Sequence, residues 1–232
     1  MAQDDTRDSA TTGFDVDWIE MASSSNSEIR TWIEDYDSIT TDDFISGQNS
    51  YITDEEINDW AEGRLNKDLN GDGSVGYALD DRVAFLESRK AAAAIDATDE
   101  WNKMEGVAFN ENAPEFLYLA MSRIESAMSD GQGDIDVTLN SCGIVYRMTM
   151  SEQWNVNRIE PAIIGGPYIS SAQNQCDVNN LAGPDNLLVL DDGRVLVGED
   201  TSKHESNMVW LWEDLSESLI PRGTISVDYV NL

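Results

Sequence analysis

Apolar and polar residues alternate differently before and after residue 100. Before it, apolar residues recur with a helical period, as at positions 29, 32, 33 and 36 of the segment 28–36. After it, short alternating runs are separated by Gly, Pro and Asn, which is typical of strands and turns. We therefore expect an acidic, mostly helical segment over residues 1–100, frayed over about the first 13 residues and with a short strand at 14–18. A β-rich segment should follow over residues 101–232.

Two further helices have recognisable start signals. Thr53-Asp-Glu-Glu56 is a capping box, in which the Thr53 hydroxyl and the Glu56 carboxylate each accept a backbone N–H of the other residue. It predicts a helix that runs to about Leu65. A third helix is predicted from Asp80 to about Ile95, because acidic residues open it, basic residues follow and four alanines continue it.

Two hairpins in the second segment look like copies of one unit. Runs 107–109 and 116–120 flank one turn, and runs 187–190 and 194–197 flank the other. Glu105 and Asp185 precede these hairpins by the same two residues and lie 80 positions apart. A valine–aromatic pair follows each hairpin, at 145–146 and at 209–210, and the two pairs are 64 positions apart. The first copy therefore carries about 16 extra residues, which we place in the stretch 122–140.

Four-stranded repeats of about 40 to 45 residues are typical of β-propeller blades. Residues 101–232 have room for about two to three blades, fewer than the roughly 4 to 8 that close a propeller. A β-sandwich would give similar hairpins and stays open as an alternative. The expected fold is mainly β with an α-helical N-terminal part, the β part being an incomplete β-propeller of about two to three blades.

The net charge of the chain excludes some classes of binding partner. The 232 residues include 45 Asp plus Glu against 14 Lys plus Arg, which gives a formal net charge of −31. This excludes nucleic-acid binding, which needs a basic surface, and disfavours an anionic membrane surface as a partner. A very salty environment would screen the self-repulsion, and a cation store is the alternative. Because the acids are spread from Asp4 to Asp228, we favour the halophilic interpretation.

The sequence leaves compartment and redox state open. No apolar stretch is long enough for a membrane span or for a signal peptide. Cys142 and Cys176 could pair or stay reduced, and two cysteines are too few to fix the compartment.

The stretch Asp68-Leu-Asn-Gly-Asp-Gly-Ser74 matches the start of an EF-hand calcium loop. Asp68, Asn70, Asp72 and Ser74 supply oxygen at alternate positions, and a glycine occupies the sixth position, where the loop turns sharply. The twelfth position, which should be a bidentate Glu, is Leu79. The stretch therefore predicts a structural calcium site of low affinity, and an Asx-rich turn without a cation is the alternative.

A second group of acids lies at strand ends. Glu105, Asp185 and Glu199 stand at corresponding places around the hairpins, with Asp200 directly after Glu199. Propeller strands of this kind meet at a central channel, where carboxylates without basic partners repel unless a hard cation joins them. We therefore predict Glu105, Asp185 and Glu199 as metal ligands. His204 is a candidate phosphate or metal contact, although a single loop histidine is more often an ordinary surface residue.

Across roughly residues 45–212 the chain resembles the PhoX-type alkaline phosphatase family. The similar stretches are Arg82-Val-Ala-Phe-Leu-Glu-Ser-Arg-Lys-Ala-Ala-Ala93, Trp101-Asn-Lys-Met-Glu-Gly-Val107, Leu117-Tyr-Leu-Ala-Met-Ser122, Cys142-Gly-Ile-Val-Tyr-Arg-Met148, Gly165-Gly-Pro-Tyr168, Cys176-Asp-Val-Asn179, Pro184-Asp-Asn-Leu187, Gly198-Glu-Asp-Thr-Ser-Lys-His204 and Asn207-Met-Val-Trp210.

The resemblance implies a β-propeller whose channel holds an iron and calcium cluster that hydrolyses phosphomonoesters, usually in exported enzymes. It also implies ligand roles for Glu105, Asp185 and Glu199. Family members are much longer, and their N-terminal propeller half has no counterpart here. Two hypotheses follow: a metal-dependent phosphomonoesterase or a truncated portion of one, and a non-catalytic calcium-binding fragment completed by a partner chain.

Overall fold

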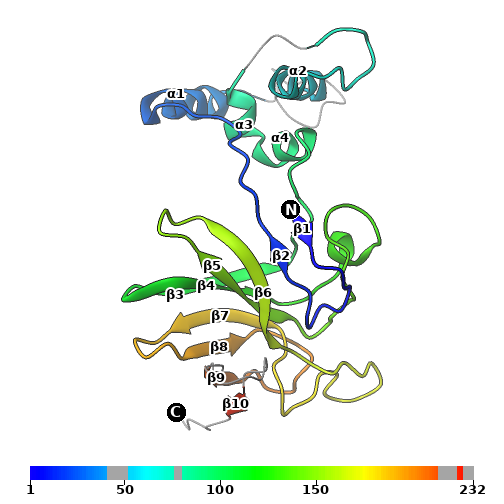
Figure 1. Cartoon of the computed structure of the whole chain (residues 1–232), viewed down its shortest axis with the longest axis vertical. Helices are drawn as coiled ribbons and strands as arrows, with labels where there is room; N and C mark the ends of the chain where they lie inside the picture. The colour runs from blue at the N-terminus through cyan, green and yellow to red at the C-terminus, as the bar shows by residue number, and fades with distance from the viewer. Residues whose placement is uncertain (41–51, 76–79, 214–223, 227–232) are drawn as a thin grey trace. The chain divides into compact units, whose positions relative to one another are not determined.

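The computed structural model describes residues 1–40, 52–75, 80–213 and 224–226 (Figure 1). The chain forms two compact units, which we describe separately. The helical unit comprises Trp18–Asp99, and the sheet unit comprises Met1–Asp17 together with Glu100–Leu232. The first seventeen residues therefore belong with the strands, whereas the sequence pattern grouped them with the helices. No helix among the described residues is long and apolar enough to cross a membrane.

The described part of the helical unit contains four α-helices, and the capping signal at Thr53 acts as the sequence predicts. The helices are α1 (Asn26–Asp37), α2 (Asp54–Leu65), α3 (Arg82–Leu86) and α4 (Ser88–Ala94). At the start of α2, Thr53 Oγ1 accepts from the Glu56 N–H at 3.1 Å, and the Glu56 carboxylate accepts from the Thr53 N–H at 2.7 Å. An equivalent capping box of Ser25 and Glu28 starts α1.

The helix predicted over residues 80–95 is instead two short helices. The chain breaks at Glu87, whose φ of −129° and ψ of 44° are not helical. At the start of α3, the Asp80 carboxylate accepts from the Arg82 backbone N–H at 3.1 Å and also pairs with the Arg82 guanidinium. Packing explains the break, because both short helices bury small or branched residues, Val83 and Ala91, in one core with Trp60.

The sheet unit consists of two antiparallel sheets (Figure 1). The first has the order β1-β2-β6-β5-β4-β3, and the second has the order β10-β9-β8-β7. The strands are β1 (Ala2–Gln3), β2 (Phe14–Asp15), β3 (Met104–Asn110), β4 (Ala113–Met121), β5 (Ile144–Met150), β6 (Val156–Ile164), β7 (Pro184–Val189), β8 (Val195–Glu199), β9 (Val209–Glu213) and β10 (Thr224–Ser226). The expectation of a mainly β fold is confirmed, and neither sheet closes into a barrel within the described strands.

The two predicted hairpins are confirmed, and each continues into a meander of four consecutive strands, β3 to β6 and β7 to β10. In the first hairpin Asn110 pairs with Ala113, which leaves a two-residue turn. The Asn110 side chain donates to the Leu190 and Asp191 carbonyl oxygens at 3.2 and 3.1 Å, so it ties the two hairpin turns together. The predicted extra residues lie between β4 and β5, where a 3-10 helix occupies Ser126–Ser129.

The N-terminal residues are ordered by contacts with a distant strand. Strand β2 pairs with β6, Phe14 is fully buried, and the Arg158 guanidinium binds Asp4 and Asp15. The expected fraying of residues 1–13 is therefore wrong. The predicted strand is also shorter than 14–18, since β2 comprises Phe14–Asp15 and the sheet unit ends at Asp17 before the helical unit begins.

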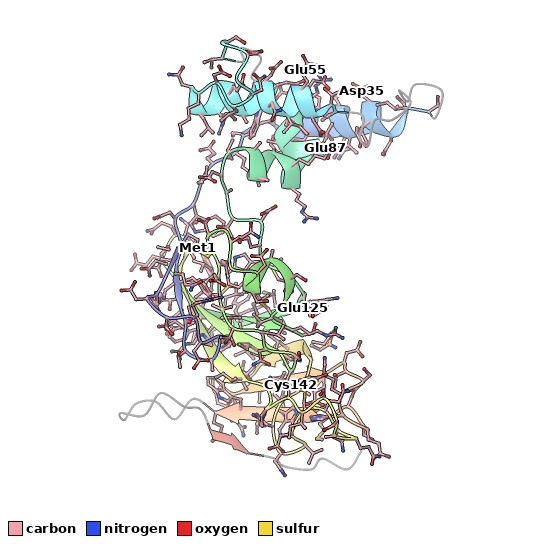
Figure 2. All side chains as sticks on the ribbon, turned by 90° about the vertical axis from the view of Figure 1, so that its right-hand side faces the viewer. Met1, Asp35, Glu55, Glu87, Glu125 and Cys142 are labelled. Atoms are coloured by element: carbon pink, nitrogen blue, oxygen red, sulfur yellow. A yellow bond between two sulfur atoms is a disulfide. The ribbon has the colours of Figure 1, made fainter. Side chains whose placement is uncertain are left out.

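Two apolar cores cover the two faces of the first sheet. On one face, residues of β4, β5 and β6 pack with Phe14 and with the loop that carries Met128 and Ile135. On the other face, Tyr118, Val145 and Ile163 pack against the second sheet. Near these cores Cys142 and Cys176 form a buried disulfide, which settles the pairing that the sequence left open (Figure 2).

Candidate cation site

Two of the predicted ligands lie on adjoining edge strands of the two sheets. Glu105 belongs to β3 and Asp185 to β7, and these strands are in contact. Gly106 makes the close approach feasible, since a Cβ atom there would lie 2.2 Å from the Asp185 carbonyl oxygen. The glycine that follows Glu105 is thus part of how the sequence brings the strands of the two acids together.

Two neighbouring acids act on the Asp185 carboxylate at this edge. The pKa of Asp185 is raised, first by partial burial and then by the negative charges of Glu105 and Asp200. Glu105 Oε1 also accepts from the Ser122 hydroxyl at 2.9 Å. Every charge that shifts the pKa of Asp185 is negative, so the three acids form a repulsive cluster to which a cation would be attracted.

The third acid of this cluster is Asp200 and not its neighbour Glu199. The Glu199 carboxylate is buried and accepts four hydrogen bonds. They come from the Ala182 N–H at 2.9 Å, the Trp210 Nε1–H at 2.7 Å, the Met208 N–H at 3.1 Å and His204 Nδ1 at 2.9 Å. This carboxylate is therefore engaged inside the protein, where it joins β8 to the two loops beside it.

Strand alternation explains why the two neighbouring acids differ. Side chains point to opposite faces at successive positions of a strand, so Glu199 shares the face of Val195 and Val197, which is buried against the first sheet. Asp200 follows the strand end and is exposed. The sequence alone could not separate them, because residues 195–197 are an unbroken apolar run that does not show which face of the strand is buried against the first sheet.

His204 is buried and has both ring nitrogens engaged. Its Nδ1 faces Glu199 Oε2 at 2.9 Å, and its Nε2 faces the Asp177 carbonyl oxygen at 3.2 Å. The side chain therefore joins the loop of residues 200–208 to the loop that holds the disulfide. In this arrangement His204 has no ring nitrogen left for a phosphate or a metal.

The described residues do not complete a metal site by themselves. Among residues 1–40, 52–75, 80–213 and 224–226, no group of three or more His, Cys, Asp or Glu side chains is spaced to hold a metal ion. The acids at 105, 185 and 200 are close enough to shift a pKa but do not form a closed shell. An iron and calcium cluster therefore does not fit the described residues alone.

The loop 68–74 in the helical unit folds its side-chain oxygens onto its own backbone. Asp68 accepts from the N–H groups of Gly71 and Gly73 at 2.6 and 2.9 Å, and Asn70 accepts from the Asp72 N–H at 2.9 Å. Asp72 accepts from both the N–H and the hydroxyl of Ser74. This chain of Asx turns suits either a calcium loop or a turn without a cation. The twelfth loop position, Leu79, lies outside the described residues.

A fully buried acid supports this loop and was missed by sequence reasoning. Glu62 of α2 accepts from the backbone N–H groups of Leu69 and Asn70 at 2.9 and 3.1 Å. It fixes the loop to the end of the helix.

A groove of about 620 Å³ lies where the two hairpin turns meet, at the opposite end of β3 and β7 from the acids. It is lined by Asn110, Ala113, Glu115, Phe116, Tyr118, Val189, Asp192, Gly193, Arg194 and Glu213. Arg194 is its basic residue and is paired with Asp192 at 2.8 Å and Glu213 at 3.6 Å. Within this described lining, no unpaired positive group is offered to a phosphate.

Comparison with known proteins gives one distant likeness. No protein family and no curated protein matches the sequence. Among solved structures, the chain is similar to PhoX of Pseudomonas fluorescens in complex with vanadate, a transition state analogue. The TM-score is 0.45 and the sequence identity 17%, over 59% of this chain and 27% of that one. The chain thus spans about a quarter of the PhoX chain, and the likeness is too distant to assign an activity.

Proposed function

We propose that this chain contributes carboxylate ligands to a divalent-cation centre that hydrolyses phosphomonoesters. The observation that carries the proposal is the repulsive cluster of Glu105, Asp185 and Asp200 on adjoining strands of two sheets. Partial burial, and then the charges of Glu105 and Asp200, raise the pKa of Asp185, and a bound hard cation with a preference for oxygen ligands would lower it. The ordered series of motifs that resembles the PhoX-type phosphatases supports the phosphomonoester as the substrate.

This chain would supply some of the metal ligands of the centre and not all of them. Calcium, and by resemblance iron, would polarise the phosphate oxygens and offset developing charge. Since the described acids form no closed shell, the remaining ligands come from a complementary chain. The meanders β3 to β6 and β7 to β10 are then two blades of an incomplete β-propeller, which the complementary chain closes. The net charge of −31 would suit such an assembly to a halophilic environment, because salt screens the repulsion between the acids.

The second candidate is a non-catalytic calcium-binding chain that uses the loop 68–74. It is favoured by the turned-in oxygens of Asp68, Asn70 and Asp72, which all face the backbone of one short loop. Calcium would add a crosslink between α2 and the residues that follow it, so its role here would be structural.

Metal content and turnover separate the two candidates. The purified chain, in high salt, is analysed for bound calcium and iron, and an aryl phosphate is assayed with and without added metal. We expect divalent-cation binding that Glu105→Gln and Asp185→Asn each weaken by several-fold, while Glu152→Gln, an exposed acid of the β5–β6 turn, leaves it unchanged. Equal loss in all three variants would indicate diffuse binding to the acidic surface and would contradict the site. Metal binding at this site without turnover would refute catalysis by the isolated chain.

The loop has its own test. Asp68→Ala should abolish the stabilisation of the helical unit by calcium, whereas Asp99→Ala, another exposed acid, should keep it. The measurement is the unfolding temperature with calcium and with a chelator. If wild-type protein shows the same temperature in both, the loop binds no calcium that matters for folding.

A further inference from the structure

The contact between the two sheets shows which faces the repeat buries. Tyr118, Val145 and Ile163 of the first sheet meet Val195, Val197, Trp210 and Trp212 of the second. Tyr118 and Trp212 are in edge contact, with ring centroids 6.0 Å apart. One copy of the repeat thus presents one face of its meander to the opposite face of the next copy.

In the second sheet, the face that is equivalent to the Val145 face of the first sheet is apolar, and no other described residues cover it. Val145 is fully buried, whereas its counterpart in the second copy, Val209, is 65% exposed, and Leu188 is 55% exposed. Leu196 pairs across the sheet with Leu188 on one side and Leu211 on the other, so they extend the same surface. We call Leu188, Leu196, Val209 and Leu211 the tail patch.

The sequence of these strands also indicates burial on both faces. An antiparallel sheet with one wet face alternates apolar and polar residues, whereas a sheet buried on both sides has continuous apolar runs. Residues 187–190, 195–197 and 208–212 are such runs. One face of the second sheet is buried against the first sheet. The tail patch lies on the other face, which has the residue composition of a buried face.

The first sheet has an exposed strip on its opposite side. Val107 is 57% exposed, Phe109 40% and Met104 54%, and all three pair with β4 residues that point to one face. Trp154 extends the strip, with its ring 6.5 Å from that of Phe109. We call Met104, Val107, Phe109 and Trp154 the head patch.

The repeat relates the head patch to an interface that already exists. By the 80-residue offset, Val107 and Phe109 correspond to Leu187 and Val189, which pack against the first sheet. Inside the chain, Leu187 and Val189 thus cover the face of the first sheet that is equivalent to the tail patch, so the head patch is suited to cover a tail patch in the same way. Both patches consist of uncharged residues, so contact between them brings no carboxylate of either patch against another, although the chain has a net charge of −31.

We propose that the tail patch of one copy docks on the head patch of a second copy, head to tail. The contact continues the internal packing of one sheet on the next from chain to chain. A contact between two different patches propagates until a ring closes, unlike a two-fold contact, which stops at a dimer. In this arrangement the second copy takes the place of the complementary chain that completes the propeller. The docking contact does not depend on the metal site, because none of the three clustered acids belongs to either patch.

Complementation between variants tests the proposal. Full-length protein is studied by sedimentation velocity in high salt, at roughly 1 M, where repulsion is screened to about 3 Å. We expect wild type to sediment at two or more times the monomer mass. Val209→Glu and Val107→Glu should each be monomeric, and Val178→Glu, in an exposed loop position, should assemble like wild type. Far-UV circular dichroism verifies that each variant is folded.

Mixing the two monomeric variants gives the decisive result. Val209→Glu keeps an intact head patch and Val107→Glu keeps an intact tail patch, so an equimolar mixture should form one contact and stop at a dimer. Monomeric wild type at every concentration would overturn the proposal. A mixture that stays monomeric while wild type assembles would overturn the head-to-tail arrangement.

Discussion

The disulfide between Cys142 and Cys176 gives the sharpest prediction about stability. Both sulfur-bearing side chains are buried, and they join the start of β5 to the loop that precedes β7. That loop also holds the Asp177 carbonyl oxygen that faces His204, and the Cys176 N–H donates to the Lys203 carbonyl oxygen at 3.4 Å. Removing the bridge with the double variant Cys142→Ala and Cys176→Ala therefore releases a loop that several tertiary contacts need.

The magnitude follows from the length of the loop that the bridge closes. The two cysteines are 34 residues apart. Closing a loop of this length lowers the entropy of the unfolded chain by about 13 cal/mol/K, which corresponds to about 4 kcal/mol near room temperature. A typical domain is stable by only about 5 to 15 kcal/mol, so the double variant should lose a large share of the stability of the sheet unit.

The assay is urea unfolding of wild type and double variant in the same high-salt buffer, with and without dithiothreitol. We expect the reductant to shift the wild-type transition to lower urea and to leave the transition of the double variant unchanged. Two results would refute the reasoning. One is a difference between the proteins below about 0.5 kcal/mol, the usual effect of a neutral surface substitution. The other is an equal response of both proteins to the reductant.

Three further predictions concern acids in different settings. Glu199→Gln should lower the free energy of unfolding by about 3 to 5 kcal/mol, because the amide NH2 would face N–H donors such as that of Trp210. Urea unfolding measures this loss, and a metal titration should show unchanged cation binding. Asp185→Asn should stabilise the protein at neutral pH by about 0.2 to 1 kcal/mol, because the raised pKa of Asp185 means that its ionisation opposes folding. The gain should vanish as the pH falls below the ordinary aspartate pKa, and a gain that persists in acid would contradict this cause. Dilution from high to low salt should lower the unfolding temperature, because self-repulsion of a chain of charge −31 is then unscreened, and a constant temperature would count against a halophilic surface.

Signals that act over a few residues predicted the structure well. The capping box at Thr53, the helical period at 28–36 and both hairpins have the expected form, because a cap or a tight turn is formed by neighbouring residues. The continuous helix over 80–95 failed for a different reason. There, local propensity favoured one helix, and burial of residues from both halves in one core favoured a break at Glu87.

The candidate site shows the same division. The sequence singled out Glu105 and Asp185 from their matching places before the hairpins, and the contact between β3 and β7 brings their charges together. It selected Glu199 and not Asp200, because the two acids are adjacent at the end of one strand whose apolar residues do not alternate with polar ones. Which of them points inward depends on the register of β8 against β9 and on the sheet that β8 packs against.

The sequence by itself determined the acidic charge, the helix starts, the repeated hairpins and the apolar runs of the second sheet. Only the tertiary structure decided the cysteine pairing, the inward orientation of Glu199 and the order of the N-terminal residues, as in the pairing of Phe14 with Ile159. The physical reason is the range of the interactions. Caps and turns depend on neighbours within about four residues, whereas disulfides, sheet faces and buried carboxylates depend on partners that only the folded chain brings into contact.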